Sequence, residues 1–348
     1  ALGLGTLGAV IGNTIAVLIA GIAGVLLMYT VYRSLPDSAD GKLDLLKTMK
    51  IMLKYGLPIS IGAIITGFLT QFYGIIMPIF VTDNALIGNY SVATNFVVLI
   101  TFFATPVTTM MLPAFSKLDF RRDQEILQNV FQYSVKYAAL IVVPVATMVM
   151  ALSQPAIGTI FGDSYLHAPL FLALLSITYL LSSLGSLSIG NLINSQGDTK
   201  YNLKLAILQA SIGFPLSFFM ISQFGIIGLI ITTIIVAMPG LFLSVGFIKK
   251  RYQVSLDWKS SAKILVSSSV TAILTYFVIS WLPFSAPITL VVGVLVFMAV
   301  FLVTAIATKT ISQEDIEIIR KIVSGLGPLR KPLTLIFNII EKLMPKQN

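Results

Sequence analysis

The 23 Lys and Arg residues of this 348-residue chain are confined to five short stretches. The sequence between two such stretches is almost purely apolar, and each of these blocks is long enough to cross a membrane twice. The breaks inside the blocks, near Asp83, Asp163, Gln223 and Pro283, carry no basic residue. This alternation is the positive-inside pattern of a membrane protein with several spans. The basic stretches are Arg33 to Lys54, Lys117 to Lys136, Lys200 to Lys204, Lys249 to Lys263 and Lys309 to Lys346.

The pattern predicts an all-α polytopic protein of the cytoplasmic (plasma) membrane, with nine spans, the first residues outside and the C-terminal end in the cytoplasm. A bilayer core of about 30 Å needs about 20 helical residues, and no predicted span has an Asp, Glu, Lys or Arg in its interior. The predicted spans are Leu4–Tyr32, Leu57–Val81, Ile87–Leu112, Tyr133–Leu152, Ala168–Asn194, Leu203–Ile221, Gly225–Ile248, Ala262–Trp281 and Pro287–Thr308.

Composition excludes a soluble globular protein, because the mean hydropathy is +0.93 and only 11% of the residues are charged. The net charge of +9 indicates cytoplasmic loops that rest on anionic membrane lipids rather than a nucleic-acid partner. The chain has no cysteine and one histidine, His167, so we expect neither a metal site nor a cofactor.

Two regions are amphipathic rather than spanning. Residues 33–54 are expected to form a cytoplasmic linker with an interfacial helix, because Leu43, Leu46, Met49 and Leu53 recur at helical spacing among lysines. Residues 311–348 are expected to form a cytoplasmic tail with further amphipathic stretches. Such a tail lies on the membrane surface or, alternatively, binds a partner.

A weak repeat links two of the predicted spans. Gly5 and Gly8 with the isoleucines that follow match Gly225 and Gly228 at an offset of 220 residues. Two unrelated glycine-containing helices would explain this, and so would two related halves of six helices each, as in some secondary transporters. Prolines inside the predicted spans favour bent helices around a cavity.

Five short motifs, in order along the chain, carry a resemblance to a known family. The chain resembles the polysaccharide-transporter branch of the superfamily that also holds the MATE multidrug exporters and the lipid II flippases. The motifs are Tyr55-Gly-Leu-Pro-Ile-Ser60, Gly88-Asn-Tyr-Ser-Val-Ala93, Leu112-Pro-Ala-Phe-Ser116, Phe161-Gly-Asp-Ser-Tyr165 and Asn194-Ser-Gln-Gly-Asp-Thr-Lys200.

The resemblance implies a MATE-like transporter of two lobes with fourteen helices, of which this chain would carry nine and lack most of the first lobe. Residues 1–32 would then be the last helix of an N-terminally truncated first lobe. Residues 55–248 would form the second, six-helix lobe, and residues 249–310 an additional pair of transmembrane helices.

Family resemblance also implies function. Members of this branch move lipid-linked oligosaccharides across the cytoplasmic membrane, so the implied partners are a polyprenyl- or dolichyl-linked oligosaccharide and membrane lipids, with the glycan assembly machinery as a further candidate. Rocking of the two lobes would expose a polar cavity to either side. The alternative is a MATE-like exporter of drugs or small solutes. An enzyme is not expected, because the acids and the histidine are not grouped for proton transfer or metal binding.

Polar side chains inside the predicted spans are the candidates for the cavity. Gln71, Tyr73 and Asn95 are the strongest, because polar groups are costly when they face lipid. Thr66, Thr70, Asn13 and Asn191 are further candidates. The alternative role for all of them is hydrogen bonding between helices.

The chain departs from its relatives at one point. Many relatives have an Asp-Arg or Asp-Lys pair where this chain has Tyr73 and Gly74. No acid in the predicted spans could carry a coupling proton or sodium ion. This absence also disfavours a site for cationic drugs.

Overall fold

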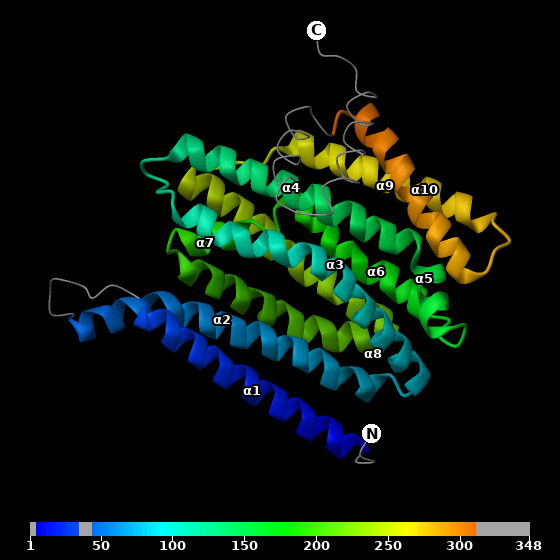
Figure 1. The fold of residues 1–348 in the computed structure, drawn as a ribbon, viewed down its shortest axis with the longest axis horizontal. Coiled ribbons are helices and arrows are strands. Elements are labelled where there is room, and N and C mark those ends of the chain that lie inside the picture. The colour runs from blue at the N-terminus through cyan, green and yellow to red at the C-terminus, as the bar shows by residue number, and fades with distance from the viewer. Residues whose placement is uncertain (1–4, 35–43, 311–348) are drawn as a thin grey trace, which may run out of the picture. The chain divides into compact units, whose positions relative to one another are not determined.

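The computed structural model describes residues 5–34 and 44–310, and every regular element in these ranges is a helix (Figure 1). Two compact units are present, residues 1–52 and 53–348. The predictions for residues 35–43 and for the tail 311–348 lie outside the described residues. The elements are α1 (Gly5–Arg33), α2 (Leu45–Phe80), α3 (Asn84–Ser116), α4 (Gln124–Ala151), α5 (Ser153–Phe161), α6 (Ala168–Leu180), η1 (Leu181–Leu184), α7 (Ile189–Ser195), α8 (Thr199–Tyr252), α9 (Trp258–Ser280) and α10 (Ala286–Ala307).

An all-helical protein with several membrane spans is confirmed, but the number nine is not. Within the described residues, seven helices are long and apolar enough to cross a membrane, or eight if the bent pair of α6–η1 and α7 forms one span. The predicted span Ala168–Asn194 is this pair, bent by 50°. Gly185 lies at the break with a φ of +83°, which favours glycine.

α8 joins two segments that the sequence predicts as separate spans. At 54 residues it would be about 81 Å long if straight, far more than a bilayer core of roughly 30 Å. Gly225 divides it, with non-helical dihedral angles of φ 57° and ψ −134°. The close approach of Gly228 to Met220 shows that the chain folds back here: a Cβ on Gly228 would lie only 2.0 Å from the Met220 carbonyl oxygen. Gly225 and Gly228 therefore lie at a tight turn between two helices.

Other boundaries differ from the expectation. Residues Leu45 to Lys54 are continuous with the predicted span that follows them, because α2 runs without interruption from Leu45 to Phe80. Pro58 lies inside it and removes only one backbone donor, which is too little to end a helix that continues on both sides. α4 begins at Gln124, before the expected Tyr133, and the short helix α5 was not predicted.

The second unit has two main hydrophobic clusters. One surrounds Leu69, Tyr73 and Leu229 and joins α2, α3, α6 and α8. The other surrounds Phe115 and Phe131 and joins α3, α4, α7 and α8. α8 contributes side chains to both clusters.

α9 and α10 lie side by side, and α9 also runs along α4 (Figure 1). Gly293 of α10 faces Leu152, at the turn between α4 and α5, so closely that a Cβ on Gly293 would lie 2.5 Å from Leu152 Cδ2. A second close contact joins the same two segments: a Cβ on Gly158 of α5 would lie 3.3 Å from the Cβ of Ala286 in α10. Glycines therefore allow α10 to pack closely against α5 and the turn that precedes it.

The loop that precedes α6 is held by a buried side chain of α3. Asn89 is 4% exposed, and its Oδ1 accepts hydrogen bonds from the backbone N–H groups of His167 and Ala168, both at 2.9 Å. Its Nδ2 donates to the Ala85 carbonyl at 2.7 Å. Asn89 therefore satisfies donors at the start of α6 that the helix itself leaves unpaired.

We expect Asn89→Ala to lower the stability of the unit by roughly 1–3 kcal/mol, because the part-buried N–H of His167 loses its acceptor and the buried N–H of Ala168 keeps only a longer bond, to the Tyr165 carbonyl at 3.3 Å. The measurement is the melting temperature of the detergent-purified protein. Ser91→Ala is the matched control, since Ser91 is exposed and its hydroxyl bonds only to its own helix. An unchanged melting temperature for Asn89→Ala would contradict this assignment.

At the other end of the unit, Gln196 holds the end of α3. Its Oε1 accepts from the Phe120 N–H at 3.2 Å, and its Nε2 donates to the carbonyls of Phe115 and Leu118 at 3.2 and 2.9 Å. The motif Asn194 to Lys200 therefore has a structural role. It satisfies backbone groups that the end of a helix leaves without partners.

Candidate functional site

Three cavities of the second unit meet at one side chain, Gln209 of α8. The first has a volume of about 450 Å³ and lies between α2, α3 and both halves of α8. The second, of about 350 Å³, lies between α2, α7 and α8. The third, of about 230 Å³, lies between the broken α6–α7 pair and α8. We call them the large, middle and small cavities. Together they are of the size of small-molecule sites, about 300–1,000 Å³.

One face of α2 supplies the wall of the large cavity. Thr66, Thr70 and Tyr73 lie three to four residues apart and therefore share a face of the helix. Thr66 also lines the middle cavity. Tyr90 of α3 and Thr233 of α8 complete the polar part of the large cavity.

The hydroxyl groups of this wall present acceptors to the cavity. Thr66 Oγ1 donates to the carbonyls of Gly62 and Ala63 at 3.1 Å, and Thr70 Oγ1 donates to the Thr66 carbonyl at 3.0 Å. Thr233 Oγ1 donates to the Ile230 carbonyl at 2.7 Å. Each hydroxyl thus uses its single donor inside its own helix and keeps lone pairs for another partner.

Tyr73 has a different environment. It is 9% exposed, and its hydroxyl is buried without a hydrogen-bond partner in the structure. The hydroxyl lies against Gly213 of α8, where an added Cβ would approach it to 2.6 Å. An unpaired buried hydroxyl is costly, by roughly 1–3 kcal/mol, and is expected where water or a ligand completes the site.

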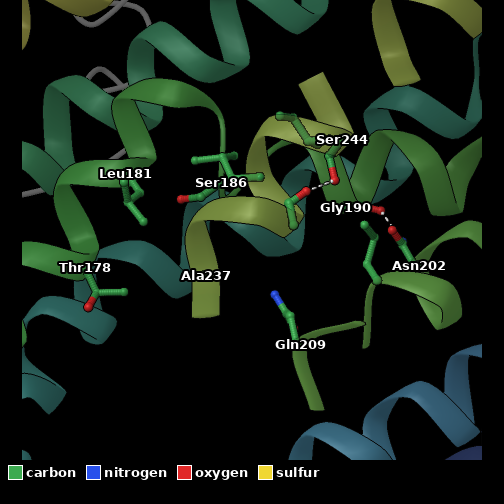
Figure 2. A pocket seen from close by; sticks show the side chains of 12 residues that line it. Thr178, Leu181, Ser186, Gly190, Asn202, Gln209, Ala237 and Ser244 are labelled. Carbon is green, nitrogen blue, oxygen red and sulfur yellow. Dashed lines mark hydrogen bonds between the residues drawn. The ribbon is translucent and has the colours of Figure 1, made fainter. Parts of the chain in front are cut away.

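Gln209 is the polar side chain common to all three cavities. Its carboxamide makes no hydrogen bond to a described residue. Figure 2 shows its nitrogen directed toward the segment of α8 that carries Ala237. A Cβ on Gly240 would lie 3.1 Å from that nitrogen, so the glycine leaves room for the amide. Gln209 therefore offers both a donor and an acceptor where the cavities join.

Two polar residues of the small cavity already have partners. The Ser244 hydroxyl donates to the Gly240 carbonyl, and Asn202 Nδ2 donates to the Gly190 carbonyl at 3.1 Å and to Asn194 Oδ1 at 2.7 Å (Figure 2). These bonds fix the walls of the cavity. Of the amide side chains that line this cavity, Gln209 is therefore the one whose hydrogen-bonding groups remain available to a ligand.

No Asp, Glu, Lys or Arg is among the residues that line the three cavities. In the described ranges, no three His, Cys, Asp or Glu side chains come together in a way that could hold a metal ion. The site offers hydroxyls, amides and aromatic rings, which suits an uncharged polar ligand.

The structure separates the residues that the sequence proposed for the cavity. Thr66, Thr70 and Tyr73 line the large cavity. Gln71 and Asn95 are exposed on the surface of the second unit. Asn191 Nδ2 donates to the Thr108 carbonyl at 3.3 Å and to the Leu187 carbonyl at 3.1 Å, so it links α7 to α3. Asn13 lies on α1, in the first unit.

Sequence reasoning missed Gln209, which the structure places at the centre. The signal was present, because Gln209 is an amide within an apolar membrane helix, as costly to expose to lipid as Gln71. Tyr90 was missed because it stands at the start of its helix, and Thr233 because a threonine in such a helix can bond to its own backbone.

The sequence is similar to proteins described as acting in polysaccharide or glycan biosynthesis. Residues 6–170 match the family described as polysaccharide biosynthesis protein. An uncharacterized membrane protein of Methanocaldococcus jannaschii is 27% identical over 191 residues, which cover 54% of this chain and 37% of that protein. The probable low-salt glycan biosynthesis flippase Agl15 of Haloferax volcanii is 21% identical over 220 residues, which cover 63% of this chain and 45% of that protein. The chain therefore spans less than half the length of these relatives.

The fold is similar to solved transporter structures. The lipid II flippase MurJ in an inward closed conformation superposes with a TM-score of 0.60 at 18% identity, covering 82% of this chain and 59% of MurJ. An outward-facing multidrug-resistance MATE family transporter superposes with a TM-score of 0.52 at 12% identity, covering 83% of this chain and 70% of that one.

These comparisons define the class: the chain is a multi-pass membrane protein with a MATE-like transporter fold. The resemblance indicated by the five motifs is also confirmed. In sequence, the chain is similar to a polysaccharide biosynthesis family over residues 6–170 and to a probable glycan biosynthesis flippase.

Proposed function

We propose that the protein flips a lipid-linked oligosaccharide across the membrane by alternating access, without covalent chemistry. A sugar headgroup cannot cross hydrocarbon unaided, because its hydroxyls would lose their hydrogen bonds to water. A polar cavity within a transporter fold can replace those bonds while the lipid tail stays in the bilayer. The cargo would be carried on a polyprenyl or dolichyl lipid.

One observation carries this proposal: the uncharged polar cavities that meet at Gln209 inside a MATE-like fold. Their hydroxyl acceptors and their free amide are the groups that bind sugars. A site for cationic drugs would gain from an acid, and the cavity linings contain none.

The exposed polar residues fit the same proposal. Gln71 on α2 and Asn95 on α3 lie within helices long and apolar enough to span a membrane, where polar groups facing lipid are costly. We propose that both face a wider aqueous part of the transport path. For Asn13 of α1 we propose an aqueous environment within its own unit. Asn191 keeps a structural role between α7 and α3.

The proposal includes topology and partners. The protein would lie in the plasma membrane with the lysine-rich loops and the C-terminal end in the cytoplasm. Residues 55–248 would act as one lobe, with residues 249–310 as an added helix pair. The glycan assembly machinery that supplies the cargo is a candidate partner.

The test is deletion of the full-length gene in its native host. Lipid-linked sugars would be extracted, and their sidedness measured with a membrane-impermeant probe. We expect lipid-linked oligosaccharide to accumulate on the cytoplasmic face and surface glycan to fall, with both defects reversed by the gene on a plasmid.

A different result would favour the exporter. If surface glycan stays normal and the deletion strain becomes sensitive to cationic drugs, the flippase proposal is wrong. The similarity to a multidrug-resistance MATE transporter makes this the second candidate.

A further inference from the structure

The polar groups that line the three cavities are all uncharged, and this restricts the cargo. We infer that the cavities joined at Gln209 bind an uncharged sugar of the cargo and exclude an acidic one, with Gln209 as the specificity-determining residue. The inference rests on the proposed function and adds to it the chemical class of the sugar.

The first step concerns charge. The linings of the three cavities contain no Lys, Arg or His that could pair with a carboxylate. The basic residues closest in sequence to a lining residue, such as Lys204 beside Leu203 and Leu205, are exposed. A uronic acid is ionised at neutral pH, since carboxyl groups titrate near pH 4. Placed in these cavities, its carboxylate would lose hydration without gaining a cation, which is strongly unfavourable.

The second step concerns the acceptors. Thr66, Thr70 and Thr233 each use their hydroxyl proton on a helix carbonyl and present lone pairs instead. Lone pairs attract the O–H groups of a neutral sugar, whereas a carboxylate has no proton to offer them. The wall of the large cavity therefore favours a hydroxymethyl group over a carboxylate in the same place.

The third step concerns Gln209. Its amide can donate to a sugar oxygen and accept from a sugar hydroxyl at once, and no described residue competes for either. Sites that bind a hydroxyl through buried polar groups discriminate strongly, because the wrong ligand leaves those groups unpaired. Gln209 reaches all three cavities, so it contacts the sugar in whichever part it lies.

The test compares two probes that differ only at carbon 6: a short-chain polyprenyl diphosphate that carries glucose and the same lipid that carries glucuronic acid. Binding to the purified full-length protein in nanodiscs is measured at pH 7. We expect the glucose lipid to bind about tenfold or more tightly than the glucuronic acid lipid. No variant is needed for this comparison.

Two variants then assign the preference to Gln209. Gln209→Leu removes the amide, and we expect it to weaken binding of the glucose lipid about tenfold. Gln209→Arg adds a cation, and we expect it to reduce or reverse the preference. Monodisperse elution and an unchanged melting temperature establish that each variant is folded.

The outcomes separate the inference from the proposed function. If both lipids bind equally, or the glucuronic acid lipid binds more tightly, the inference is overturned while the flippase proposal stands. If neither lipid binds, the flippase proposal fails and the inference falls with it. If the preference is present but unchanged in both folded variants, the role given to Gln209 is overturned.

Discussion

Gly228→Ala is expected to prevent the second unit from folding. The added Cβ would lie 2.0 Å from the Met220 carbonyl oxygen and 2.5 Å from its carbonyl carbon. Both are backbone atoms of the preceding helix, so they cannot move aside as a side chain could. Relief requires the two halves of α8 to separate, and these halves carry residues of both main hydrophobic clusters.

The expected loss in the free energy of unfolding is more than about 4–5 kcal/mol, at the upper end for single substitutions. This approaches the whole free energy of unfolding of a typical protein, roughly 5–15 kcal/mol. The measurement is the amount of monodisperse protein that detergent extracts from cells. Gly246→Ala is the matched control, because Gly246 lies in the same helix with no atom within 4 Å of an added Cβ. Equal yields of the two variants would show that the turn at Gly225 tolerates a wider spacing than the structure has.

Thr66→Trp is expected to abolish transport while the protein stays folded. Thr66 is half-buried and lines both the large and the middle cavity, so an indole at this position extends into space that the cargo would occupy. We expect surface glycan in the deletion strain to stay at the level of the empty vector when this variant is supplied. Thr66→Ser keeps the hydroxyl and removes only a methyl group, and should restore surface glycan.

Ile64→Trp controls for the bulk of the indole. Ile64 is on the same helix but is 69% exposed, so its replacement adds the same ring outside the cavities. We expect Ile64→Trp to be active and to accumulate like the wild type. Normal transport by Thr66→Trp would mean that these cavities do not lie on the cargo's route.

The membrane spans could be predicted because hydropathy and charge act over whole segments. Thirty ångströms of hydrocarbon require about 20 apolar residues wherever they occur, so helices such as α3, α9 and α10 follow from the sequence within a few residues. The break of α8 at Gly225 also falls at the boundary that the sequence predicts between two spans, but the bend at Gly185 could not be predicted in this way. Gly185 and its serine neighbours are apolar enough to resemble a continuous span, and only packing decides that the chain bends there.

The candidate site was predicted only in part, because the sequence names polar residues but not the direction in which they point. Gln71 and Tyr73 are two residues apart on α2, which places them about 200° apart around the helix. One is therefore exposed while the other is buried against Gly213. Gln209 could be recognised only once the fold of α8 was known. Its position at the junction of three cavities arises because segments that are distant in sequence come together around it.

The glycine contact between α10 and Leu152 limits how the second unit can deform. Leu152 is 2% exposed, and its side chain packs in the space left by the missing side chain of Gly293. If α10 slid along its axis, Leu152 would collide with a bulkier side chain of α10. α9 in turn runs along both α10 and α4. We therefore expect α9 and α10 to move together with the lobe as one rigid body and not to separate from it. The side of the unit that they cover should then stay closed to the cargo throughout the transport cycle.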